Sequence, residues 1–135
     1  MKIKVDIKRV YDEASDEDDY RILVDRLWPR GVKKAALHFD LWCKELAPSP
    51  ELRKWFGHKP ERWQKFRHQY ETELQDPEKA SRLRELIKEA NSSHITLLYG
   101  ARDEQHNHAL ILADEIARVA KPLRKARTKK AKPDG

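Results

Sequence analysis

The chain has 135 residues, enough for one domain with its own hydrophobic core. Hydrophobic and charged residues each make up 39% of it, and no apolar run approaches the ~20 residues of a membrane-spanning helix. The single cysteine, Cys43, excludes an intramolecular disulfide. Because the N-terminal segment also lacks the apolar stretch of a signal peptide, we expect a cytoplasmic protein.

The formal net charge of +6 originates at the C-terminal end of the chain. Residues 121–135 contain seven basic residues and one acid, whereas residues 1–120 contain 22 of each. We therefore divide the chain into an α/β domain, residues 1–121, and a basic tail, residues 122–135. Such a tail either stays disordered and solubilises the protein or binds nucleic acid by neutralising phosphates, and both interpretations stay open.

Two strands are predicted in the first quarter of the chain. Apolar and charged residues alternate over Ile3–Val10, which is the period of a half-buried strand. Residues 12–19 are acidic and predict a loop, and Tyr20–Val24 predicts the second strand. Proline and glycine mark a loop over residues 28–37. Residues 41–46 fit either a short strand or a helix.

Three helices are predicted next. Ser49-Pro50-Glu51 combines a capping hydroxyl, a first-turn proline and an acid, and this helix is expected to end near Gly57. Pro60 begins the second helix, and Asp76-Pro77-Glu78 repeats the start signal for the third. Apolar residues three and four positions apart, as over residues 63–74, give the second and third helices one buried face each.

The last part of the chain predicts a strand and a helix. The continuous apolar run His94–Tyr99 is typical of a strand buried on both faces of a parallel sheet. A polar loop follows, and the apolar spacing over residues 109–120 predicts a closing helix that ends near Pro122. This order of elements predicts a small single-domain α/β sandwich, in which helices flank a short, largely parallel sheet.

Polar side chains gather where the predicted strands end. The stretch Asp25–Gly31 follows the second strand, and residues 100–108 follow the buried strand. Parallel strands bring their carboxyl ends to one edge of a sheet, where ligands of open α/β folds bind. Arginine at such an edge indicates an anionic partner, because its planar fork pairs with phosphate or carboxylate.

We therefore predict a site for an anionic ligand at this edge. The arginines would hold the anion, the aromatic side chains would wall or stack against the ligand, an acid would act as a general base, and a histidine would carry protons. The predicted ligand-binding residues are Arg26, Trp28, Arg30, Arg53, Tyr99, Arg102 and Asn107, and the predicted catalytic residues are Asp25, Asp103 and His108.

Ordinary structural roles stay open for several of these residues. Asp103 is suited to cap the last helix, Asp25 to pair with Arg26, and Trp28 to cover the core. Without a neighbouring base, Cys43 is expected to be a packed thiol. No zinc motif and no glycine-rich phosphate loop is present, so we predict neither a metal nor a cofactor.

Four motifs in the same order resemble the YeaO-like branch of the DUF488 family of uncharacterised proteins. The resemblance covers residues 3 to about 118 and implies a compact α/β domain in a bacterial or archaeal cytoplasm, without an assigned activity. This chain departs from the family pattern at Cys43, where an aliphatic residue is expected, and at Gly100, where alanine is expected. The motifs are Asp25–Gly31, Glu45–Ser49, Leu52–Phe56, and Thr96–Tyr99 together with Asp103, Asn107, His108 and Ala109.

Three functions stay open, and enzymatic activity is not decided. The first is a hydrolase, transferase or ligand-binding domain that acts on a nucleotide or nucleic acid. The second is a non-enzymatic nucleic-acid-binding module that uses the tail and the aromatic and basic helices around Trp55 and Trp63. The third is a structural or regulatory protein in which the arginines and acids form internal ion pairs.

Overall fold

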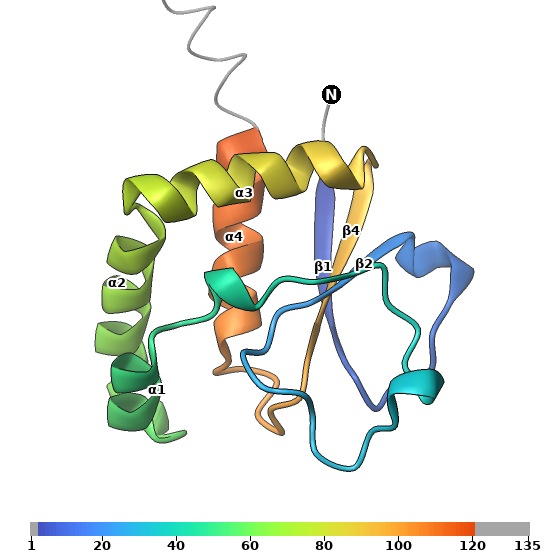
Figure 1. The fold of residues 1–135 in the computed structure, drawn as a ribbon. Coiled ribbons are helices and arrows are strands. Elements are labelled where there is room, and N and C mark those ends of the chain that lie inside the picture. Colours follow the sequence, from blue (N-terminus) through green and yellow to red (C-terminus); the bar gives the residue numbers. More distant parts are fainter. Residues whose placement is uncertain (1–2, 121–135) are drawn as a thin grey trace, which may run out of the picture.

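Four strands and four α-helices make up residues 3–120, the part of the chain that the computed structural model describes (Figure 1). The predicted tail, residues 122–135, lies outside the described residues. No helix within residues 3–120 is long and apolar enough to cross a membrane. The elements are β1 (Lys4–Arg9), β2 (Tyr20–Leu23), β3 (Leu41–Trp42), α1 (Pro50–Phe56), α2 (Trp63–Leu74), α3 (Pro77–Ala90), β4 (His94–Tyr99) and α4 (His108–Ala120).

The strands form one sheet in the order β1-β4-β2-β3, and every pairing is parallel. The prediction of a small α/β domain with a parallel sheet is confirmed. β4 is central: its Ile95 lies opposite Val5 of β1 and Tyr20 of β2. Residues 95–99 are all buried, as the continuous apolar run predicted.

The two faces of the sheet are covered differently. Ile95, Leu97 and Tyr99 of β4 pack into a large core with residues of α1, α2, α3 and α4, which lie together on one face (Figure 1). Leu98 points the other way, into a smaller core that includes Leu37 and is covered by loop residues. The helices therefore flank one face only, and loops and short 3-10 turns cover the second.

The helix starts follow the predicted signals. The Ser49 hydroxyl accepts a hydrogen bond from Leu52 N at 3.2 Å and caps α1, which ends at Gly57 in the left-handed conformation. Ser49 Oγ also donates to Glu73 Oε2 at 2.6 Å and so ties α1 to α2. Residues 41–46 contain both alternatives, a two-residue strand followed by a 3-10 turn.

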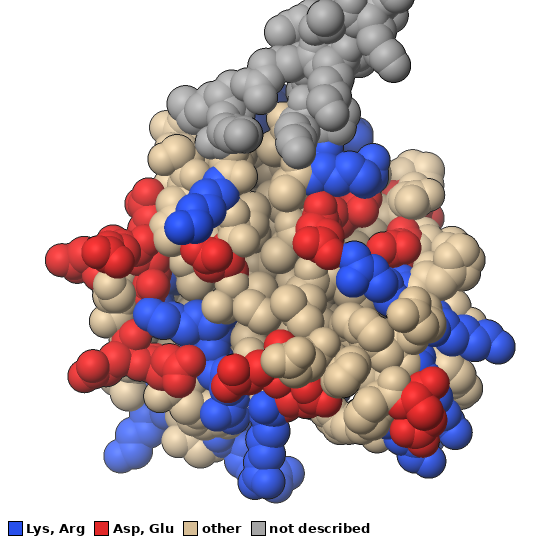
Figure 2. Space-filling model, turned by 180° about the vertical axis from the view of Figure 1, so that it is seen from behind, with Lys and Arg blue, Asp and Glu red and all other residues tan. Residues whose placement is uncertain are grey.

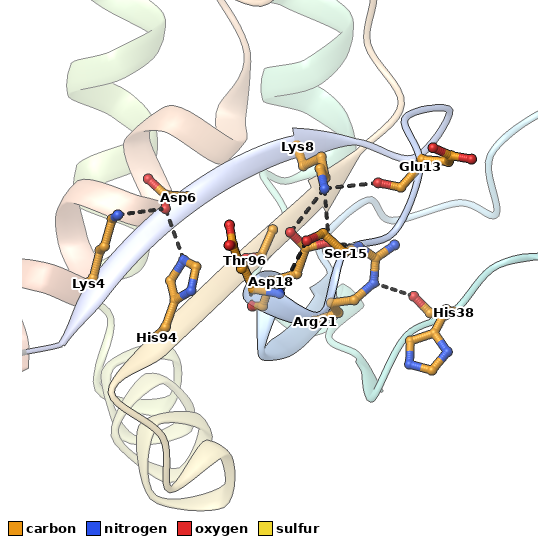
Figure 3. A network of polar contacts seen from close by, with 11 residues as sticks. Lys4, Asp6, Lys8, Glu13, Ser15, Asp18, Arg21, His38, His94 and Thr96 are labelled. Carbon is orange, nitrogen blue, oxygen red and sulfur yellow. Dashed lines mark hydrogen bonds and ion pairs between the residues drawn. The ribbon is translucent and has the colours of Figure 1, made fainter.

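A buried ion network supports the face that the loops cover (Figure 3). Asp18, from a 3-10 turn in the acidic loop, accepts hydrogen bonds from Lys8 Nζ at 2.9 Å and Ser15 N at 3.0 Å, and it pairs with the Arg21 guanidinium. Its backbone carbonyl accepts from Thr96 Oγ1 at 2.8 Å. Although burial acts to raise the pKa of Asp18, these donors hold the pKa below its ordinary value.

Asp18→Ala is expected to destabilise the protein by about 3–5 kcal/mol, because it leaves the buried Arg21 guanidinium without its carboxylate. The matched control is Asp16→Ala, which removes an exposed carboxylate from the same turn. The free energy of unfolding in urea at neutral pH measures both effects. Equal losses in the two variants would contradict a supporting role for the network.

Candidate functional site

A cleft of about 630 Å³ opens at the edge of the sheet where β1, β2 and β4 end, the lower end of the sheet in Figure 1. Tyr11 contributes from the end of β1, and residues 25–30 contribute from the loop after β2. Residues 47–58, in and around α1, form another wall, and residues 100, 101 and 106–108 supply the last. Parallel pairing thus brings together loops that are about seventy-five positions apart in the sequence.

Most of the residues predicted for the site line this cleft. They come from the loop after β2, from α1, and from the start of α4. They are Asp25, Arg26, Trp28, Arg30, Arg53, Asn107 and His108.

Tyr99, Arg102 and Asp103 do not line the cleft. The Tyr99 ring is 2% exposed and packs in the core on the helix side, because the alternation of β4 turns it with Ile95 and Leu97. The exposed Arg102 lies outside the lining. The prediction placed these three residues at the site, whereas the structure places them outside the lining of the cleft.

Asp103 faces its own loop. Its carboxylate accepts hydrogen bonds from Gln105 N at 2.9 Å, His106 N at 3.1 Å and His106 Nδ1 at 2.9 Å. The alternative that it caps the last helix is also not observed. Asn107 has that role, since its Oδ1 accepts from Leu110 N at 3.2 Å.

Trp28 combines the two roles considered for it. Its Nε1 donates to the carbonyl of Val32 at 2.6 Å, and its ring meets Phe39 and Trp42 edge to face. It therefore covers the smaller core, while another part of the residue borders the cleft.

Asp25 and His108 lie together in the cleft. Asp25 Oδ2 accepts from Gly100 N at 2.9 Å, and Oδ1 lies 3.5 Å from His108 Nε2. The Nε2 of His108 is 3.0 Å from the carbonyl oxygen of Val24, which can only accept, so Nε2 carries a proton. Oδ1 is buried and has no hydrogen-bond partner within residues 3–120. Asp25 does not pair with Arg26.

Burial dominates the electrostatics of this pair. It raises the pKa of the Asp25 carboxyl, against the opposing effects of His108, Gly100 N–H and Arg53. It lowers the pKa of His108, against the opposing effects of Asp25 and the Val24 carbonyl. His108 is therefore neutral at neutral pH.

Because residue 100 is glycine, no side chain at that position crowds the Asp25 carboxylate. A Cβ atom at position 100 would lie 3.0 Å from Asp25 Oδ2, tighter than almost all ordinary Cβ contacts. The family pattern described in the sequence analysis has alanine at position 100. The departure from the family pattern thus falls on a residue in direct contact with Asp25.

Basic side chains surround the cleft. Arg26, Arg30, Arg53 and Lys54 are exposed, and within the described part of the chain none of them forms an ion pair. The lining contains one acid, Asp25. On the face seen in Figure 2, by contrast, acidic and basic side chains lie side by side. The basic groups at the cleft thus contrast with the mixed charges of that face.

Sequence reasoning missed several lining residues. Lys54 follows Arg53 in α1, and His58 follows the end of that helix with a positive φ of 57°. His106 was not among the residues predicted for the site. Nothing local in the sequence signals that these three residues line one cleft, because the tertiary structure brings them to it.

Other candidate chemistry is not supported by the geometry. The Cys43 thiol is fully buried, and burial raises its pKa to about 11, so it stays protonated. Within residues 3–120, no group of three or more histidine, cysteine, aspartate or glutamate side chains is placed to hold a metal ion.

Comparison with known proteins places the chain in a family. Residues 4–133 match the family model described as "Inactive DUF488-N3 subclade". The chain belongs to the DUF488 family. The uncharacterized protein YeaO of Escherichia coli K12 is 49% identical over 113 residues, which cover 83% of this chain and 96% of YeaO.

Two further DUF488 relatives come from mycobacteria. The uncharacterized proteins Mb3100c of Mycobacterium bovis and Rv3073c of Mycobacterium tuberculosis are each 40% identical over 110 residues, covering 82% of this chain and 91% of the relative. No solved structure matches the chain. Neither the family description nor the name of any of these relatives states a substrate.

The wild-type DUF488 domain is expected to lose stability as the pH falls from about 7.5 to 5.5. His108 in the unfolded chain takes up a proton near its ordinary pKa of 6.5, whereas buried His108 resists protonation, so acid favours the unfolded state. The His108→Gln variant, whose amide can still donate to the Val24 carbonyl, should lose less stability over the same pH range. Urea unfolding at several pH values measures the difference between the two proteins.

Asp25 contributes with the opposite sign, because its raised pKa makes the folded state hold a proton more tightly and so opposes acid unfolding. Repeating the comparison in an Asp25→Asn background removes that contribution. If the free energy of unfolding falls equally with pH in Asp25→Asn and in the double variant Asp25→Asn/His108→Gln, His108 does not cause the loss of stability.

Proposed function

We propose that this domain binds a small anionic ligand, of the phosphate or carboxylate type, in the cleft at the carboxyl edge of its sheet. The observation that carries the proposal is the set of exposed basic side chains from two separate elements, Arg26 and Arg30 from the loop after β2, and Arg53 and Lys54 from α1. They surround one concave surface without acidic partners among the described residues.

The gathering of unpaired basic groups supports this proposal. Among the described residues, Arg21, Arg67, Arg82 and Arg118 form ion pairs with acids, whereas Arg26, Arg30 and Arg53 form none and line the same cleft. A concave surface concentrates the field of unpaired charges and raises the local concentration of anions. Arginine adds geometry to charge, since two parallel N–H groups match the oxygens of a phosphate or carboxylate.

The size of the cleft and its apolar part favour a small molecule. Its volume of about 630 Å³ is within the usual range of small-molecule pockets. Phe56 and Phe66 lie in its lining and stack on each other with ring centroids 4.3 Å apart. A ligand with both an anionic and an apolar part, such as a nucleotide, fits this combination.

Binding without turnover agrees best with the remaining observations. The family model that matches carries the description "inactive". Two side chains that could act as nucleophiles are engaged elsewhere, since Cys43 is buried and the Ser49 hydroxyl is bonded to Glu73. Hydrolysis or transfer is the second candidate, and it is favoured by the buried Asp25 carboxyl next to His108.

Titration of the full-length protein with inorganic pyrophosphate, followed by amide NMR shifts and calorimetry, tests the proposal. Shifts are expected at residues 25–30 and 53–58. Arg53→Ala should weaken binding by about tenfold or more, because a charge-assisted hydrogen bond contributes about 1.5–3 kcal/mol. The matched control is Arg84→Ala, an exposed arginine of α3 outside the cleft.

Equal weakening in the Arg53 and Arg84 variants, or shifts spread away from the cleft, would contradict the proposal. A protein that lacks residues 122–135 separates the tail from the cleft. Pyrophosphate binding that disappears with the tail and is insensitive to Arg53→Ala would favour the alternative of a tail-dependent nucleic-acid-binding module.

A further inference from the structure

His106 stands apart from the other side chains of the cleft because a carboxylate holds it in place. Its Nδ1 lies 2.9 Å from Asp103 Oδ2, and its ring meets Trp63 edge to face with centroids 5.4 Å apart. These contacts fix the ring from two sides, one from its own loop and one from α2. A ring fixed in this way keeps one orientation, and His106 is one of the residues that line the cleft.

The hydrogen-bond pattern of Asp103 decides which nitrogen of His106 is free. Hydrogen bonds from Gln105 N and from His106 lower the pKa of Asp103, so the carboxylate is ionised and can only accept. Nδ1 of His106 must therefore carry the proton that it donates. In the neutral ring Nε2 is then an acceptor, and it has no hydrogen-bond partner within residues 3–120.

A second acceptor lies in the same cleft. Asp25 Oδ1 is buried and unpartnered among the described residues, while Oδ2 is occupied by Gly100 N–H. A buried carboxyl oxygen without a donor is rare in folded proteins, because it loses its hydrogen bonds to water. Because this oxygen is buried, the pair has to rearrange slightly before a donor from a ligand can reach it.

The cleft therefore contains both hydrogen-bond donors and hydrogen-bond acceptors. The donors are the basic groups of the loop after β2 and of α1, and the acceptors are Asp25 and His106, which follow β2 and precede α4. A simple anion such as phosphate uses the donors only. A divalent cation suits neither the basic groups nor the lone acceptor nitrogen.

We propose that the ligand is a phosphorylated sugar, such as the ribose 5-phosphate unit of a nucleotide, and that His106 Nε2 accepts a hydrogen bond from one of its hydroxyl groups. Arg26, Arg30 and Arg53 hold the phosphate, and Asp103 is a positioning residue that fixes the tautomer of His106. This inference rests on the proposed binding of an anion and adds the hydroxyl-bearing part of the ligand.

The test compares AMP with its 2′,3′-dideoxy analogue, because the two probes have the same base and phosphate and differ in two hydroxyl groups. Calorimetry on the full-length protein is expected to show AMP binding about tenfold tighter. In His106→Ala this preference should fall to less than about twofold, with the dideoxy analogue unaffected. His68→Ala, at an exposed histidine of α2 outside the cleft, is the matched control and should keep the preference.

The role of Asp103 has a spectroscopic test that needs no ligand. The ring ¹⁵N shifts of His106 should show the Nδ1–H tautomer in the wild type. In Asp103→Asn they should show the Nε2–H tautomer, because the asparagine amide can donate to Nδ1. The asparagine oxygen still accepts from Gln105 N, so the loop is expected to stay folded.

The outcomes separate this inference from the proposed function. Pyrophosphate binding at the cleft with equal affinities for AMP and its dideoxy analogue would overturn the inference and leave anion binding standing. Binding of none of the three probes would overturn both. An Nε2–H tautomer in the wild type, or a preference for AMP that survives His106→Ala, would remove His106 from the hydroxyl contact.

Discussion

The pairing of β4 with parallel strands on both sides is the constraint on which the rest of the structure depends. It buries residues 95–99 completely and brings the ends of β1, β2 and β4 to one edge. Asp25 and Gly100 become neighbours only because β2 and β4 run side by side in the same direction. A slip of one residue in this register would turn Leu98 toward the helices and would also separate the groups of the cleft.

Two aspartates, Asp18 and Asp25, show how the same residue type can support the fold or contribute to a candidate site. Asp18 receives hydrogen bonds from Lys8 and Ser15 and an ion pair from Arg21, and its pKa is lowered. Asp25 receives one backbone hydrogen bond, keeps one oxygen unpartnered among the described residues, and has a raised pKa. A satisfied network rigidifies a fold, whereas an unsatisfied group in a cleft is available to a ligand.

Local signals predicted the elements well, because capping and periodicity depend on residues close in the sequence. As predicted, α1 begins directly after Ser49 and ends directly before Gly57. The site was harder to predict. Tyr99 ends a strand that leads to the cleft, yet its position in the alternation of β4 turns it into the core. Asp103 sits in the right loop but is held by the backbone of its own turn. These placements depend on side-chain direction, which the position of a residue at a strand end does not specify.

The pair of Asp25 and His108 depends on tertiary structure alone, because 83 positions separate the two residues and both are polar groups beside a hydrophobic core. Keeping such a pair buried costs stability, since burial opposes the charged form of each member. A purely structural role would be served as well by two apolar side chains of similar volume. The pair instead lies in the cleft that basic residues surround, next to Gly100, where a side chain would crowd the carboxylate. The position of the pair therefore favours a role at the proposed ligand site over a purely structural one.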